Sequence, residues 1–571
     1  TPLHVAAEKG NTGLCELMLE ANANINDEDA NERLAMHVAM QHGAFQTARF
    51  LMQRMNESQG KDAQYRRKKR SDKAEQLATR ILSGKLDEKD FREATQESFP
   101  ELQYFSDKEN ADKSKTLGAL LAVYWITANH YDLFVRAQPE NARLTKKSWE
   151  VLQEWTVHTV RLKKSAQIVG AMLVFVEVMN LGKIKPFQKA FAPGFDEPTE
   201  ALHYILQKAP LVIPSFSNLN EEMQHMILSA LKADFNFGQF LQAENLPASL
   251  STVKQILGED TSKKGSGSTD ILGFFLFKIF AAMCGILGMK SLEGSLFMTD
   301  KLFTNFKVGL DVLQNLMNQS AEEVYDKFLA ERAKAQCLTF SQYNPEARAR
   351  VRLACLTRAF DAENGKAVSD AISALDHETQ KKLLDFVNVD GITEKPAFLL
   401  YNSPNFLSAG KDSKNIGLTL ALKVLLRIYE AAAAEYKDTE KAVVSVFVDE
   451  IVEYVKSPNI DAETFDFVKF EILRTAGQKA DSQGSVHISP WQLVTDQKVI
   501  EGLTEEGGAL AHDVLRSGMR EPGFVKRIQT VFPEMNFMTS SEADDITKAI
   551  LKETVGALLV VYWTASDQVE A

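Results

Sequence analysis

The chain has few of the residues that build disulfide frameworks or zinc sites. Among its 571 residues there are four cysteines, Cys15, Cys284, Cys337 and Cys355. No two of them form a metal-ligand pair of the C-x-x-C type, and no regular spacing suggests paired disulfides. We therefore expect free thiols that pack as small apolar groups, which is typical of a reducing compartment.

The sequence also lacks the motifs of nucleophilic catalysis and phosphate binding. No serine lies in a G-x-S-x-G arrangement, and the Gly265–Ser268 run is not followed by the Gly-Lys of a nucleotide-binding loop. Two E-x-x-H pairs, Glu200/His203 and Glu222/His225, have the spacing that places both groups on one helix face. The apolar residues of both segments lie on other faces, so we expect these pairs to face solvent. We predict no catalytic residue, no metal site and no cofactor.

Charge of one sign is not concentrated over the chain as a whole. The net charge of −12 is small for 571 residues and does not favour a dedicated nucleic-acid-binding protein. The exception is the basic run Arg66–Arg70, which suits a nuclear localisation signal, a patch for an acidic partner, or a solvated connector. The connector is the favoured interpretation. We expect a cytoplasmic protein, with the nucleus as the alternative.

One long apolar run raises the question of a membrane contact. Ile271–Met289 has a single charged residue, Lys278, close to its middle. This length is near the lower limit for crossing a bilayer, and a central charge is costly there. The favoured interpretation is a buried helix in a helical domain. An exposed patch of phenylalanines in this run would instead indicate docking at a membrane.

What the chain does contain is a repeat with a period of 33 residues at its N-terminus. Thr1–Gly10 (TPLHVAAEKG) is matched by Leu34–Gly43 (LAMHVAMQHG), and Leu17–Leu19 is matched by Phe50–Met52. A period of about 33 headed by T-P-L-H-x-A resembles the ankyrin repeat, in which a β-turn is followed by two antiparallel helices. The resemblance covers residues 1–54 and implies binding to a protein partner.

The first copy is close to the family pattern and the second is degraded. Asn22 follows the second helix, where it can adopt the left-handed conformation that ends helices. In the second copy Leu34 and Ala35 replace the Thr-Pro pair, as in terminal repeats that have one face without a neighbour. Two repeats are fewer than the roughly three that a stable array needs. We therefore expect a truncated array, with further repeats upstream.

The rest of the chain has helical periodicity nearly throughout and little strand alternation. We predict an all-α protein, in which two N-terminal ankyrin repeats precede a large, irregular multi-helix domain. Residues 415–435 and 439–456 are two of the expected helices. The expected organisation is ankyrin repeats at 1–54, a basic linker at 55–76, a helical domain at 77–476, a linker at 477–505, and a second copy of the 77–128 motif at 506–571.

The second copy of the 77–128 motif is inferred from a long-range similarity within the chain. Leu77–Phe105 aligns with Leu510–Met538 without a gap, and Thr116–Trp125 aligns with Thr554–Trp563 at eight of ten positions. Either the chain holds one whole unit and the start of another, which is favoured, or the copies are two halves of one domain. Because the Tyr-Trp helices have no polar face, we expect both to be buried.

We expect partner binding at the tip of the ankyrin hairpin and on the adjoining helix surfaces, because loops on a rigid stacked scaffold carry variable contacts. The predicted partner-binding residues are Glu8, Lys9, Asp29, Asn31, Glu32, Arg33, Gln41 and His42. The favoured function is a scaffold or adaptor whose helical domain offers a second surface. The alternatives are an enzyme of unrecognised type in the helical domain and a peripheral membrane protein that docks through residues 271–289.

Overall fold

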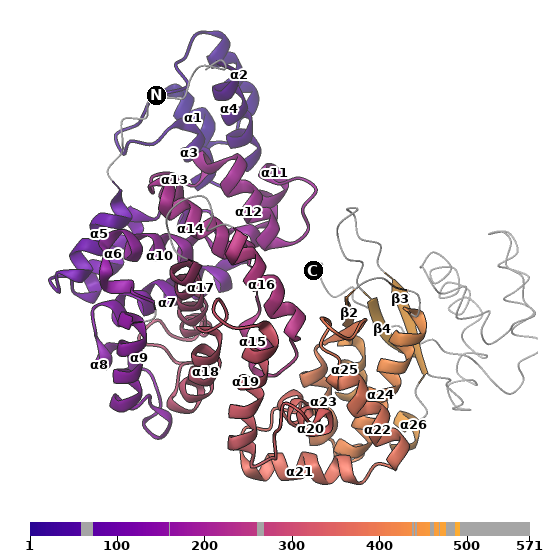
Figure 1. Cartoon of the computed structure of the whole chain (residues 1–571). Helices are drawn as coiled ribbons and strands as arrows, with labels where there is room; N and C mark the ends of the chain where they lie inside the picture. Colours follow the sequence, from indigo (N-terminus) through magenta and orange to yellow (C-terminus); the bar gives the residue numbers. More distant parts are fainter. Residues whose placement is uncertain are drawn as a thin grey trace, which may run out of the picture. The chain divides into compact units, whose positions relative to one another are not determined.

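The chain forms two compact units, which Figure 1 shows as a computed structural model. Unit 1 contains Thr1–Phe237 and Ser249–Val324, and unit 2 contains Gly238–Ala248 and the chain from Tyr325 onward. The structure describes residues 1–58, 72–158, 160–233, 235–259, 268–436, 439, 442–456, 462–466, 469–474 and 486–491. The second copy of the 77–128 motif, with Trp563, lies outside the described residues. Its relation to the first copy stays a prediction, and so do the domain boundaries expected from the sequence.

The N-terminus folds as two ankyrin repeats, as predicted. The four helices are α1 (Pro2–Glu8), α2 (Thr12–Glu20), α3 (Ala35–Gln41) and α4 (Phe45–Ser58). Gly10 and Gly43 follow the first helix of each repeat with φ of +65° and +72°, a conformation that glycine adopts without steric cost. Asn22 has φ of 64° after α2, which confirms its expected role in ending that helix.

The two repeats use equivalent histidines to bind the next layer of structure. The Nε2–H of His4 donates to the carbonyl oxygen of Arg33 at 2.8 Å, which ties the first repeat to the second. The Nε2–H of His37 donates to the carbonyl oxygen of Leu211 at 2.9 Å, in the short helix η6 (Pro210–Val212). The helical region therefore takes the position of a third repeat. The expectation that one face of the second repeat lacks a neighbour is wrong at this contact.

Aromatic packing reinforces this junction within unit 1. The Phe45 ring lies 5.6 Å from the Phe187 ring and 6.4 Å from the Tyr104 ring, measured between centroids. The Tyr104 hydroxyl donates to the carbonyl oxygen of Val212 at 2.8 Å. In Figure 1 the four ankyrin helices lie directly above α11 (Lys185–Phe191) and α13 (Pro214–Ser217). The ankyrin repeats and the helical region therefore pack against each other through aromatic side chains.

The remainder of unit 1 is an irregular assembly of helices. Its main elements are α5 (Lys73–Leu82), α6 (Glu88–Ser98), η1 (Pro100–Gln103), α7 (Asn110–Thr127), α8 (Tyr131–Val135), α9 (Lys146–His158), α10 (Ala166–Val178), α12 (Pro198–Lys208), α14 (Glu221–Lys232), α17 (Ser268–Cys284) and α18 (Asp300–Leu313). Three helices continue across the boundaries between the units: α15 (Phe237–Leu241), α16 (Pro247–Glu259) and α19 (Ala321–Gln336).

The centre of unit 1 is built on close contact between α7 and the chain at the end of α17. A Cβ atom on Gly118 would lie 2.9 Å from the Cα of Gly285, and one on Gly285 would lie 2.4 Å from the backbone nitrogen of Ala119. The two backbones meet where both residues lack a side chain. Trp125 at the end of α7 is 1% exposed, which confirms that this apolar helix is buried.

The apolar run at 271–289 packs inside unit 1 over the length of α17. Its four phenylalanines are at most 2% exposed, and they are Phe274, Phe275, Phe277 and Phe280. The Lys278 ammonium lies 5.2 Å from the centre of the Phe175 ring. A different segment, Ala166–Lys183, is long and apolar enough to span a membrane by length and composition, and 72% of it is buried inside the structure. The buried core helix of a globular protein can have the same length and apolar composition.

Unit 2 combines helices with a small sheet. The helices are α20 (Pro345–Leu356), α21 (Ala362–Ser373), α22 (His377–Asn388), α23 (Ser403–Asp412), α24 (Gly417–Glu435), α25 (Asp449–Lys456) and α26 (Ala462–Asp466). The strands are β1 (Ala397–Tyr401), β2 (Val443–Phe447), β3 (Lys469–Arg474) and β4 (Val486–Trp491), in the order β1-β2-β4-β3. β1, β2 and β4 are parallel, and β3 is antiparallel to β4.

The sheet corrects one expectation, although the described chain is predominantly helical as predicted. The helix expected at 439–456 is β2 followed by α25. β4 lies within residues 477–505, where a linker is expected, and the domain boundaries stay a prediction. A short run of valines fits either a strand or a buried helix, and pairing with β1 decides for the strand. Both faces of β1 are covered: Phe398 and Leu400 belong to the main core of unit 2, and Leu399 packs against Leu246. An apolar sequence without alternation is typical of such a strand.

Candidate functional site

A cleft of about 670 Å³ lies in unit 1, where the ankyrin hairpin meets the helical region. Four segments line it: the tip of the ankyrin hairpin (residues 28–33) with α3, the start of α5, the end of α6 with η1, and α13. We call this the hairpin cleft. Its volume is within the range of sites that hold small ligands or short peptide segments.

The hairpin cleft brings together four of the eight predicted partner-binding residues. The four in the lining are Asn31, Glu32, Arg33 and Gln41. Asp29 is not in the lining but accepts a hydrogen bond from the Arg33 side chain. The other three lie outside the lining: Glu8 and Lys9 form an exposed ion pair at 3.3 Å, and His42 ends α3. The binding role of all eight residues stays a prediction.

The hairpin tip is held rigid by one carboxylate. Asp29 accepts backbone N–H bonds from Asn31 and Arg33, each at 2.9 Å, and a bond from the Arg33 guanidinium at 2.8 Å. Burial alone raises the pKa of Asp29, but the bonds from Arg33 and Asn31 outweigh burial and lower it. Arg33 also donates to the side-chain oxygen of Gln41 at 2.5 Å. The charge of Arg33 is therefore compensated within the tip.

Two fully buried carboxyl groups lie behind the cleft wall. The backbone N–H of Ser215 donates to Glu101 Oε1 at 2.7 Å, and the Ser215 hydroxyl donates to Glu177 Oε2 at 3.4 Å. The S-x-x-E spacing of Ser98 and Glu101 suggests a capping box, but Glu101 turns to Ser215 instead. Glu101 Oε2 and Glu177 Oε1 have no hydrogen-bond partner among the described residues.

The burial of this pair changes its protonation. Desolvation raises the pKa of Glu101 to about 7, and it raises the pKa of Glu177 well above its ordinary value, with a further contribution from the Glu101 charge. Two neighbouring carboxylates away from water cannot both ionise at low cost. The pair therefore retains a proton at neutral pH, and it is a structural weak point that the sequence pattern did not predict.

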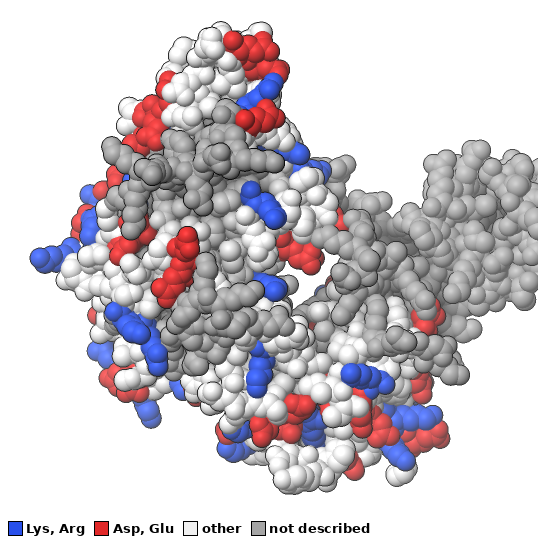
Figure 2. Space-filling model, turned by 45° about the horizontal axis from the view of Figure 1, so that its top comes forward, with Lys and Arg blue, Asp and Glu red and all other residues white. Residues whose placement is uncertain are grey.

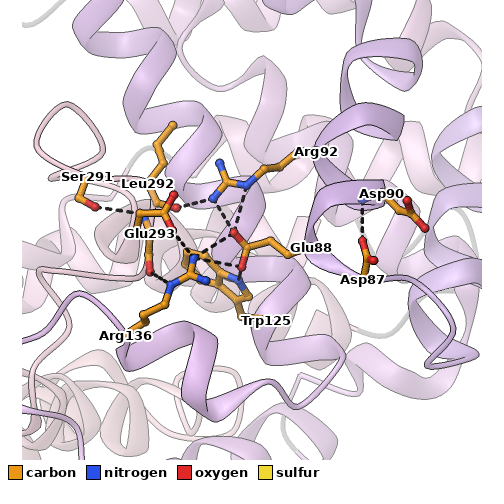
Figure 3. Close-up of polar contacts among 9 residues, drawn as sticks. All are labelled: Asp87, Glu88, Asp90, Arg92, Trp125, Arg136, Ser291, Leu292 and Glu293. Atoms are coloured by element: carbon orange, nitrogen blue, oxygen red, sulfur yellow. Dashed lines mark hydrogen bonds and ion pairs between the residues drawn. The ribbon is translucent and has the colours of Figure 1, made fainter.

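A second polar cluster in unit 1 is centred on Glu88 (Figure 3). Its carboxylate accepts from the Trp125 indole at 3.2 Å and from Arg92 at 2.7 Å, and it forms an ion pair with Arg136 at 3.2 Å. Arg136 also pairs with Glu293 at 2.5 Å. The cluster joins α6, α7 and α8 to the loop that carries Glu293. Because these partners already occupy both carboxylate oxygens, we assign the cluster a structural role.

Unit 2 contains a mixed polar cluster at the carboxyl ends of β1 and β2. Glu244 Oε1 accepts the backbone N–H of Asn402, the residue after β1, at 2.7 Å. The Asn402 side chain donates to the carboxylate of Asp449, the first residue of α25 and two residues beyond β2. Arg358 donates to Gln242 at 2.7 Å and faces Glu244. Ligands of parallel α/β sheets commonly bind at this edge.

The same cluster has strained backbone and a perturbed acid. Ala243, Arg358 and Asn402 have positive φ values of 53°, 56° and 69°. Burial raises the pKa of Glu244 to about 7, against the lowering effects of the Asn402 N–H and Arg358, while Asp449 raises it further. A carboxyl group that titrates near neutrality is suited to acid–base chemistry. Sequence reasoning missed this cluster because its members come from four distant segments.

The two E-x-x-H pairs do not belong to a cluster of metal-ligating side chains among the described residues. The described residues contain no group of three or more His, Cys, Asp or Glu side chains that could hold a metal ion. His225 Nδ1 instead bonds to the hydroxyl of Ser229 at 2.9 Å, one turn along α14.

The fold and the hairpin cleft together define an ankyrin-repeat protein whose array is fused to a helical region. Residues 1–63 match the family model described as ankyrin repeats (3 copies). Residues 83–464 match the model of a family of unknown function (DUF6829), and the chain belongs to that family. A search of curated proteins and a search of solved structures each found no match.

Proposed function

We propose that this protein is an adaptor, whose ankyrin hairpin and helical region bind one protein partner together. Ankyrin repeats generally mediate binding between proteins, and the hairpin cleft supports the finer proposal because both parts of unit 1 line it. The carrying observation is the bond from His37 to the backbone of Leu211, which joins the hairpin layer to the helical region. A partner in the cleft would contact both parts at once.

The proposal includes a cytoplasmic location. Cys15, Cys284 and Cys355 are free and buried, and Cys337 is free and exposed, which suits a reducing compartment. The basic run Arg66–Arg70, which would favour the nucleus, lies outside the described residues. Imaging of the chain fused to a fluorescent protein, with and without substitution of this run, distinguishes the two locations.

A pair of exposed tip substitutions tests the adaptor function. Asn31→Arg with Glu32→Arg alters the cleft rim without removing a buried group, because both residues are exposed. The matched control is Glu20→Arg at the exposed end of α2, outside the cleft. We expect quantitative affinity purification of the whole chain to lose specific partners with the tip variant and to retain them with the control.

Unchanged partners in the tip variant would contradict the adaptor proposal, provided that its unfolding temperature equals that of the control. Deletion of residues 1–60 is less informative. It removes Phe45 from Phe187 and Tyr104, so it exposes part of the helical core as well as removing the binding surface.

The Glu244 cluster supports an enzyme in unit 2 as the second candidate function. Chromogenic esters, phosphate monoesters and glycosides are suitable first probes, because an acid of pKa about 7 suits proton transfer in each reaction. Turnover by the whole chain that Glu244→Gln abolishes would support this candidate. Turnover that Glu244→Gln leaves intact would assign the activity elsewhere.

A further inference from the structure

The hairpin cleft carries an excess of carboxylate groups. Its lining has four acidic side chains, Glu28, Glu32, Asp72 and Glu97, and two basic ones, Arg33 and Lys73. Arg33 is already paired with Asp29 at 2.7 Å, so its charge does not offset the other carboxylates. Acidic side chains are prominent over the ankyrin repeats at the top of the face in Figure 2.

The end of α6 adds to this negative potential. The last carbonyl groups of a helix carry partial negative charge, which lysine or arginine in the last turn usually complements. The last turn of α6 has no basic residue, and its exposed Glu97 lies in the cleft lining. A cation from outside the chain would complement the same helix end.

Other parts of the lining suit the long stems of basic side chains. Pro100 and Pro214 are half-buried and lie in two segments of the lining, η1 and α13. Lysine and arginine pack their methylene groups on such apolar surface while the charged end reaches carboxylates. Asp72 is partly buried, and burial raises its pKa, so a bound cation would relieve the cost of keeping this carboxylate ionised.

We propose that the hairpin cleft binds a segment of the partner protein that presents lysine or arginine side chains. This inference rests on the proposed adaptor function and adds the chemistry of the partner. The cleft acids recognise the cationic ends, the two prolines contact the stems, and the hydrogen bonds around Asp29 keep the hairpin tip in place. Negative charge on the same segment would be repelled.

A random twelve-residue peptide library displayed on phage tests the proposal directly. The library is selected on three immobilised forms of the whole chain: the natural sequence, the cleft variant Glu32→Lys/Glu97→Lys, and the control Glu20→Lys/Glu150→Lys. All four glutamates are exposed, so each variant changes surface charge equally and leaves the core intact. Only the first pair lies in the cleft lining.

We expect peptides selected on the natural chain and on the control to be enriched in lysine and arginine, and those selected on the cleft variant to lose this enrichment. A representative synthetic peptide, measured by fluorescence anisotropy, should bind the cleft variant about tenfold more weakly, since each exposed ion pair contributes up to about fivefold and reversal adds repulsion. Binding of that peptide should also weaken with added salt.

Three results would overturn the inference. One is selected peptides without basic enrichment, another is equal binding to all three forms, and the last is full displacement of the peptide by equimolar spermine, which would identify a polyamine site. Loss of cellular partners in the tip variant, together with any of these results, would reject the basic segment and leave the adaptor function standing. Retention of every partner would reject both.

Discussion

At the scale of single residues, the buried acids are the feature that no sequence pattern predicted. Glu101 and Glu177 are both fully buried and are bridged by Ser215. Glu177 stands within the apolar helix α10, whose composition indicates burial, whereas the polar sequence around Glu101 does not distinguish it from a surface glutamate. Neither local sequence shows that the two carboxyl groups meet, because that depends on which elements pack together. A carboxyl in such a site destabilises the fold whenever it is forced to ionise.

The effect of pH on this pair has a definite sign. Folded Glu101 keeps its proton up to a pKa of about 7, whereas the ordinary value that applies to the unfolded chain is 4.5. The folded state therefore binds more protons between these values, and its stability falls as pH rises through this window. Below about pH 4.5 both states are protonated, and the difference disappears.

Glu101→Gln is expected to stabilise the protein at pH 8 by roughly 1–3 kcal/mol, since one pKa unit corresponds to about 1.4 kcal/mol. The amide oxygen can still accept the Ser215 N–H, but it cannot ionise. Denaturant unfolding at pH 4 and pH 8 measures the change, with exposed Glu97→Gln as the control. Equal effects at the two pH values would mean that ionisation of Glu101 does not limit stability.

At the scale of elements, α7 shows how far an apolar pattern can be interpreted. Its lack of a polar face predicts burial, and Trp125 and Tyr124 are at most 1% exposed. The pattern does not reveal the partner helix, nor the bond from the Trp125 indole to Glu88. The partner helix is set by the close approach of Gly118 and Gly285, and the indole bond is set by the packing of α6 on α7.

Trp125→Ala should cost roughly 3–5 kcal/mol of stability, as large buried aromatic residues do. The variant leaves a cavity beside Phe134, whose ring centre lies 6.1 Å away, and removes one donor from Glu88. Denaturant unfolding of the whole chain measures the loss. A cost below about 1 kcal/mol would contradict tight packing at this site.

Gly285→Ala should be more disruptive than a one-carbon change normally is. The new Cβ would lie 2.4 Å from the Ala119 nitrogen and 2.5 Å from the Lys115 carbonyl oxygen, both backbone atoms that cannot rotate away. We expect a loss of roughly 1–3 kcal/mol or more, as in overpacked cores.

The matched control for Gly285→Ala is Gly13→Ala in α2. The nearest atom to its new Cβ is the Asn11 side-chain oxygen at 3.9 Å, so space is available. Alanine there should stabilise the helix by about 0.5–1 kcal/mol. If both variants destabilise the protein equally, the close crossing of α7 and α17 is not the cause.

At the scale of the larger assembly, unit 1 unites parts that the sequence presents as separate. The ankyrin repeats and the helical region have unrelated sequence patterns, yet His37 connects them as His4 connects the first repeat to the second, and Phe45 adds an aromatic contact. This connection is what gives the hairpin cleft two walls. An adaptor function of the hairpin cleft therefore requires that the ankyrin repeats stay packed on the helical region.

His37→Ala and His4→Ala form a matched pair that tests this arrangement. Each removes one side-chain bond to a backbone carbonyl, so each should cost about 1–2 kcal/mol. Hydrogen exchange should quicken in α3 and η6 for His37→Ala, and in α1 and the hairpin for His4→Ala. Faster exchange confined to α1 in both variants would contradict the role of His37 as a link to the helical region.

The sequence by itself determined what depends on local chemistry and periodicity. The 33-residue repeat, the left-handed Asn22 and the burial of Trp125 follow from spacing, a single backbone preference and an unbroken apolar surface. Four of the eight predicted partner-binding residues also reach the hairpin cleft, because the tip of an ankyrin hairpin is fixed by its own repeat.

Only the tertiary structure decided which distant segments meet. The strand at β2 exists because β1 is available to pair with it, although the local sequence is equally suited to a helix. The Glu101–Glu177 pair, the Glu244 cluster and the second wall of the hairpin cleft likewise combine residues that are far apart in the chain. Such contacts arise from the free energy of packing whole elements together, and no local pattern encodes that sum.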